Sequence, residues 1–166
     1  MFQKTFLVAA LIAGLVPAAI AQLSNADKTF VMKAAQAGNY EIQAAKLAQQ
    51  NSNNDAYKSY ADMIISDHTK AGDELKSAVA QADPSMTMPT GVSAKQQQHL
   101  DALKNAGDKF DSTYRHQMMS THMVALKLAQ NYVAMPDANG QIKQVAQGFI
   151  PVSQKHLAEA KKLPKQ

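Results

Sequence analysis

Residues 30–48 read FVMKAAQAGNYEIQAAKLA, and the spacing of their apolar side chains predicts an α-helix. Apolar residues recur every three or four positions, which places them along one face of the helix. Most of them are small, so neighbouring helices can approach closely. Glu41 lies within this apolar face. A carboxylate in such a place requires a partner, because burial of an unpaired charge is costly.

Three later segments repeat this periodicity, and each carries one histidine on or beside its apolar face. His68 falls in a helix expected to end near Ala82, His122 in one expected over residues 108–134, and His156 in the last helix of the chain. No alternating pattern typical of strands competes with these helices. The sequence therefore predicts an all-α protein of four long helices, with Glu41 and the three histidines distributed one per helix.

The boundaries of the helices follow from capping and helix-breaking residues. Ser24 or Asn25 is expected to cap the first helix, which runs to about Gln50, and Ser93 to cap a short helix that ends near residues 105–107. Pro151 is expected to kink the last helix, because proline removes a backbone donor. Residues 83–107 connect the second and third long helices. They are expected either to cross the length of a ferritin-like bundle or to fold back within a simple up-down-up-down bundle.

Residues 1–21 have the pattern of a secretory signal peptide, with Lys4 before an apolar run and cleavage expected after Ala21. Residues 22–166 are then expected to form a single domain without a transmembrane segment, and the chain contains no cysteine. We expect a periplasmic or secreted protein. The formal net charge of +4, or +3 without Lys4, is small and spread out, which disfavours nucleic acid as a partner.

The four polar residues have compatible heights along the predicted bundle. At about 1.5 Å per residue, Glu41 and His68 differ by roughly 6 Å across their shared turn. His122 and His156 differ by roughly 7 to 8 Å, and errors in the helix ends are of similar size. A common layer is therefore allowed. Asp111 lies about 16 Å along the helix from His122 and cannot join it, whereas Asp67 faces a neighbouring helix rather than the ligand set.

Three imidazoles and one carboxylate form a ligand set suited to a single zinc, copper or iron ion. A di-iron centre is not expected, because the chain contains no Glu-x-x-His motif. In the alternative interpretation, Glu41, His68, His122 and His156 are structural residues that satisfy one another. A His- and Met-containing stretch at residues 116–123 suits Cu(I), although filling of the core by Met118 is favoured. His99 and His116 are expected at the surface.

Short motifs along the chain resemble those of a bacterial family of exported, ferritin-like proteins. The family is catalogued as a domain of unknown function, and its members are often labelled as outer membrane proteins. The resemblance implies a ferritin-like bundle and an exported location, and it brings no established activity. It rests on Phe30-Val31, Ala34-Ala35 and Glu41; Asp67-His68-Thr69-Lys70 and Leu75; Phe110-Asp111, Tyr114, Gln117-Met118 and His122; and Ile150-Pro151 and His156-Leu157.

Two functions fit these features. The first is a metal-binding or metal-buffering bundle that uses Glu41, His68, His122 and His156. The second is a non-catalytic envelope or stress protein that binds a protein partner, or a second copy of itself, through a helix face. Enzymatic activity is disfavoured, because no nucleophile motif or phosphate-binding loop is present. An enzyme with a redox metal is a third and weaker alternative, since it requires an open coordination position.

Overall fold

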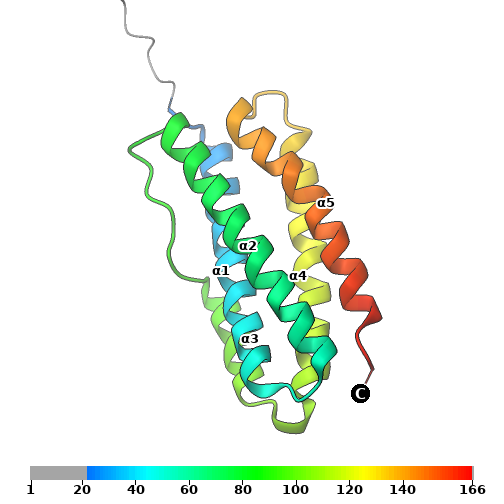
Figure 1. The fold of residues 1–166 in the computed structure, drawn as a ribbon. Coiled ribbons are helices and arrows are strands. Elements are labelled where there is room, and N and C mark those ends of the chain that lie inside the picture. Colours follow the sequence, from blue (N-terminus) through cyan, green and yellow to red (C-terminus); the bar gives the residue numbers. More distant parts are fainter. Residues whose placement is uncertain (1–21, 166) are drawn as a thin grey trace, which may run out of the picture.

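Four long helices form an antiparallel bundle in the computed structural model, which describes residues 22–165 (Figure 1). They are α1 (Asn25–Asn51), α2 (Asp55–Ala82), α4 (Phe110–Val133) and α5 (Gly140–Lys162). The short helix α3 (Ala94–Lys104) and the 3₁₀ turn η1 (Gly107–Lys109) lie in the connection between α2 and α4. The all-α prediction is confirmed, since the described residues contain no strand.

The helices begin where capping side chains occur. Ser24 and Asp27 form a capping box at the start of α1, and Ser93 and Gln96 form another at the start of α3. Both starts agree with the sequence-based prediction, and α1 ends one residue later than expected, at Asn51. The helix α5 continues through Pro151. The predicted signal peptide, residues 1–21, lies outside the described residues.

The connection from α2 to α4 runs the length of the bundle. Figure 1 shows that α2 ends at the end of the bundle where α1 begins, whereas α4 starts at the opposite end. The helices α2 and α4 are therefore parallel, and α3 packs outside the ring against α1 and α4. Of the two expected topologies, the one with a long crossover is present. Gly107 turns the chain into α4 with a positive φ of 51°.

Two apolar clusters fill the bundle, one toward each end. The first contains the buried rings of Tyr40, Tyr57 and Tyr114, and the second contains those of Phe30 and Tyr132. Each cluster draws side chains from all four long helices. The polar residues of interest occupy the level between the clusters, so the apolar packing on either side fixes their position and excludes water from most of them.

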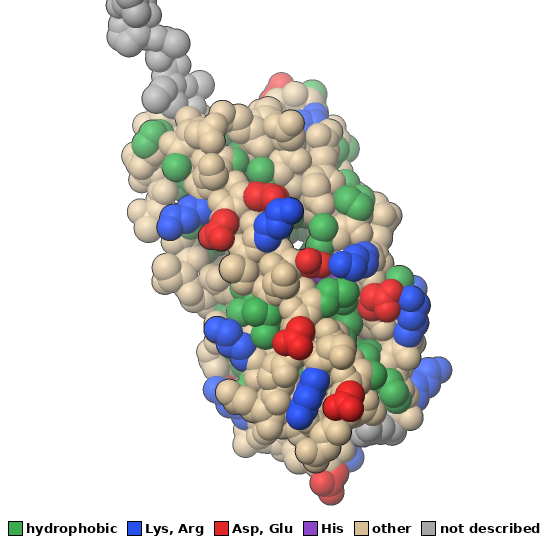
Figure 2. Space-filling model, viewed as in Figure 1, with side chains coloured by type: hydrophobic (Ala, Val, Ile, Leu, Met, Phe, Trp, Pro, Cys, Tyr) green, Lys and Arg blue, Asp and Glu red, His purple; other side chains and the backbone are tan. Residues whose placement is uncertain are grey.

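One face of the molecule carries charges of both signs without a dominant patch (Figure 2). Figure 2 shows acidic and basic side chains interspersed over one face, with apolar side chains between them. Within residues 22–165, no helix combines the length and the apolar character needed to cross a membrane.

Candidate metal centre

Each long helix contributes one side chain to a polar layer in the middle of the bundle. Glu41 comes from α1, His68 from α2, His122 from α4 and His156 from α5. One ring nitrogen of each histidine lies within 4.8 Å of a ring nitrogen of the other two. The Glu41 carboxylate approaches two of them, with Oε2 3.0 Å from Nε2 of His68 and Oε1 3.8 Å from Nε2 of His122. The structure thus brings together all four residues selected from the sequence.

Hydrogen bonds to the outer ring nitrogens orient His122 and His156. Nδ1 of His122 donates to the backbone carbonyl of Met118, 2.7 Å away, one helical turn earlier. Nε2 of His156 donates to Oδ2 of Asp67 at 2.9 Å, and Lys155 contacts the same oxygen at 3.0 Å. These partners are acceptors, so they place the ring protons on the outward-facing nitrogens. Asp67 therefore binds a neighbouring helix, as its position in the sequence predicts.

The two remaining nitrogens of this pair face each other without a proton to share. Nε2 of His122 lies 3.1 Å from Nδ1 of His156. Burial lowers the pKa of both rings, that of His122 to about 4, so both are neutral at pH 7. Each neutral ring already carries its one proton on the other nitrogen, which leaves two lone pairs in contact. Such an arrangement is unfavourable by itself and becomes favourable when a cation accepts both lone pairs.

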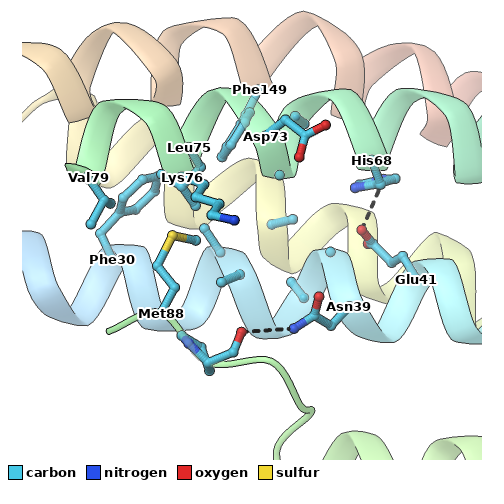
Figure 3. A pocket seen from close by; sticks show the side chains of 18 of the residues that line it. Phe30, Asn39, Glu41, His68, Asp73, Leu75, Lys76, Val79, Met88 and Phe149 are labelled. Atoms are coloured by element: carbon cyan, nitrogen blue, oxygen red, sulfur yellow. Dashed lines mark hydrogen bonds and ion pairs between the residues drawn. The ribbon is translucent and has the colours of Figure 1, made fainter. Parts of the chain in front are cut away.

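Glu41 and His68 complete the layer on the side of α1 and α2 (Figure 3). Burial raises the pKa of Glu41 to about 8 and lowers that of His68 to about 3, so both groups are predominantly neutral at pH 7. Nε2 of His68 forms no hydrogen bond despite its 3.0 Å contact with Oε2 of Glu41. Oε1 of Glu41 and Nε2 of His68 are both buried without a hydrogen-bond partner. Two further polar atoms in the layer are therefore unsatisfied.

Other polar residues discussed from the sequence lie outside this layer. Asp111 is buried but is not part of the histidine cluster, and His116 is exposed. His99 is half-buried rather than exposed, because its ring lies against Tyr40 with the ring centroids 6.2 Å apart. The role of the Met118 carbonyl was not foreseen. Every helical residue has a backbone carbonyl, so residue type does not mark Met118 for this role. The only indication in the sequence is that Met118 precedes His122 by four residues, which is one helical turn.

A transition-metal site is the class of centre that these donors fit best. Metal-ligating histidines typically donate their second ring N–H to a carboxylate or a carbonyl, as His156 and His122 do. In a tetrahedral site, two nitrogens about 2.0 Å from one ion lie roughly 3.3 Å apart, close to the 3.1 Å observed here. We therefore describe this layer as a candidate metal centre.

The chain belongs to the family described as a domain of unknown function (DUF4142), which matches residues 14–163. Among solved structures, it is similar to CopM in the Cu(II)-bound form, with a TM-score of 0.68 and 21% sequence identity. That alignment covers 82% of this chain and 93% of CopM. A comparison with curated proteins gave no match.

Proposed function

We propose that this protein binds a single transition-metal ion in the middle of its helical bundle. The ligands are Nε2 of His68, Nε2 of His122 and Nδ1 of His156, with the carboxylate of Glu41 as the fourth. One observation carries the proposal: the bare nitrogens of His122 and His156 face each other at 3.1 Å while their other nitrogens are held by Met118 and Asp67. A purely structural pair would place a proton between these nitrogens.

Copper is the first ion to test, ahead of zinc and iron. Three neutral imidazoles and one carboxylate suit all three ions by ligand type. The similarity in fold to CopM, which was solved with Cu(II), supports starting with copper. The apolar clusters on both sides of the layer would limit access of water and of competing ligands, which suits an ion held for storage or buffering. No catalytic step is part of the proposal.

The protein is proposed to act outside the cytoplasm. Residues 1–21 carry the pattern of a signal peptide, so the mature chain would begin at Gln22. Amino-terminal sequencing of protein from the native host tests this directly, and retention of Met1 would contradict it.

The metal content of tag-free protein tests the proposed function. After incubation with Cu(II), Zn(II) or Fe(II) and dialysis, we expect one bound ion per chain by elemental analysis. His122→Ala and His156→Ala should abolish tight binding, whereas His116→Ala, a change to an exposed histidine on the same helix as His122, should not. Far-UV circular dichroism checks that each variant remains helical. Equal metal content in the wild type and both core variants would favour a structural role for these residues.

A further inference from the structure

A cavity of about 650 Å³ adjoins the candidate metal centre. All four long helices line it, and residues 84–90 of the crossover form one wall. The exposed residues Thr69 and Asp73 also line it, so the cavity opens to solvent. Glu41 and His68 lie at one end, and Phe30 lies toward the other (Figure 3). The cavity therefore connects the solvent with the level of the metal centre.

His68 is the one proposed ligand with appreciable contact to solvent. Its side chain is 13% accessible, whereas those of Glu41, His122 and His156 are 1%, 0% and 0% accessible. Glu41 and His68 line the cavity, and His122 and His156 do not. An ion that approaches through the cavity therefore meets the side chains of Glu41 and His68 before it reaches the other two imidazoles.

The ring of His68 is also the least restrained of the three. The Met118 carbonyl and the Asp67 carboxylate hold the outer nitrogens of His122 and His156. Among the described residues, neither ring nitrogen of His68 has a hydrogen-bond partner. A side chain without such bonds changes rotamer readily where space is available. His68 is thus the ligand that can move aside and return.

Two glycines leave open space beside this ring. Gly38 precedes Glu41 by three residues on α1, and Gly72 follows His68 by four residues on α2. Because α1 and α2 are antiparallel, both glycines lie about one turn from the ligands, toward the Phe30 end of the cavity that they line. A Cβ added at Gly38 would lie 3.9 Å from Nδ1 of His68, and one added at Gly72 would meet nothing within 4 Å. The approach to His68 is therefore bordered by backbone.

We infer that the metal ion enters and leaves its centre through this cavity, between Gly38 and Gly72, while the ring of His68 turns aside. The inference rests on the proposed metal site and adds the route by which that site is loaded. The ring returns once the ion has reached His122 and His156, which completes the ligand set and closes the passage. Binding that requires such a movement is slower than diffusion allows. The passage then determines the rate of loading, and the ligands determine the affinity.

Substitutions at the two glycines test this route without removing a ligand. Gly72→Ala and Gly72→Leu should narrow the passage by increasing amounts, and Gly38→Ala should fill space beside the ring. An obstruction raises one barrier that entry and exit share, so it slows both equally and leaves the affinity unchanged. Gly148→Ala and Gly148→Leu are the matched controls, because Gly148 is helical, has open space around it and does not line the cavity. Every change replaces a helical glycine, so each should raise helix stability similarly.

The experiment follows Cu(II) uptake by the metal-free full chain in a stopped-flow instrument, with quenching of tyrosine fluorescence as the signal. Release is followed after copper-loaded protein is mixed with excess EDTA. Gly72→Leu should slow both uptake and release at least about tenfold, with an affinity within about twofold of the wild type. Gly72→Ala and Gly38→Ala should slow both steps by smaller factors, and both Gly148 variants should match the wild type.

The outcomes separate the two proposals. One bound copper per chain together with wild-type rates in Gly72→Leu and Gly38→Ala would overturn the route and leave the metal site intact. Slower uptake with unchanged release would also overturn it, because the affinity would then have fallen through distortion of the ligands. If Gly72→Leu is unfolded by circular dichroism, the two alanine variants decide between these results. A chain that takes up no metal by elemental analysis would overturn both proposals.

Discussion

At the scale of single residues, hydrogen bonds to the outward-facing nitrogens of His122 and His156 give the inward-facing lone pairs that the proposed metal site requires. The Met118 carbonyl and the Asp67 carboxylate hold the ring protons on the outside, so both lone pairs point inward. The Met118 carbonyl belongs to the helix backbone and cannot be removed by mutation. Asp67 is a side chain at the edge of the bundle, and its contribution can be measured.

Asp67→Ala is expected to lower metal affinity about 10- to 100-fold, because it removes the acceptor that orients His156. Competition with a chromophoric chelator measures the affinity. Asp73→Ala, which removes an exposed acid from the same helix, serves as the control and should leave the affinity unchanged. Equal loss in the two variants would indicate a general effect of charge rather than orientation of the ring.

Glu41 is expected to release about one proton when the ion binds at pH 7. Its pKa of about 8 keeps the carboxyl protonated in the metal-free protein, and coordination requires the carboxylate. Titration calorimetry in buffers of different ionisation enthalpy counts the protons. Glu41→Gln should reduce the count by about one, and an unchanged count would show that Glu41 is not a ligand.

The residues of this layer could be selected from the sequence, but their contacts could not. A carboxylate and three histidines stood out because each interrupts an apolar helix face. Their meeting point depended on helix heights known only to within roughly 6 to 8 Å from the sequence. The structure removes that uncertainty, since the apolar clusters above and below the layer fix the register of all four helices.

At the scale of the elements, local capping explains why most helix starts agree with prediction. Ser24, Asn54, Ser93 and Asn139 each accept a hydrogen bond from the first turn of a helix.

The course of residues 83–93 could not be predicted, because prolines and polar residues indicate that a helix ends but not where the chain runs afterwards. The position of this segment depends on a contact between residues that are 50 positions apart in the sequence. In it, the Asn39 side chain donates to the backbone carbonyl of Pro89 at 3.1 Å.

Asn39→Ala is expected to loosen this crossover while leaving the bundle folded. The Asn39 amide also donates to the carbonyl of Gly91 at 3.1 Å, so the substitution removes both links to α1. Amide hydrogen exchange over residues 84–92 should accelerate, with a loss in unfolding free energy of about 1 kcal/mol. Asn131→Ala, at an exposed position on α4, should change neither quantity. Unchanged exchange in Asn39→Ala would mean that packing of Met86 and Met88 alone holds the segment.

At the scale of the whole molecule, the buried layer makes stability depend on pH in the metal-free protein. Burial lowers the pKa of His68 to about 3 and that of His122 to about 4, and it also lowers the pKa of His156, so the unfolded state takes up protons on all three rings as the pH falls below about 6.5 while His68 and His122 stay neutral in the folded state. Glu41 has a raised pKa of about 8, so the folded state retains one proton that the unfolded state has released. The unfolded state therefore binds a net excess of at least about one proton near pH 5.5, which makes stability fall on acidification.

Stability of the metal-free protein should therefore peak near pH 6.5. Below about pH 6 it should fall by at least about 1.4 kcal/mol per pH unit, and from pH 7 to 8 it should fall as pH rises, because Glu41 then accounts for most of the difference in bound protons between the states. Urea unfolding followed by circular dichroism in the presence of a chelator measures this profile. Glu41→Gln should remove the decline above pH 6.5, and a profile identical to that of the wild type would contradict the raised pKa of Glu41.

The central claim concerns where an ion binds, and anomalous diffraction tests it most directly. Crystals of protein loaded with one equivalent of Cu(II) should give one strong peak at the copper absorption edge. We predict that the peak lies about 2.0 to 2.1 Å from Nε2 of His68, Nε2 of His122 and Nδ1 of His156. A peak at an exposed site such as His116, with the core layer empty, would contradict the account.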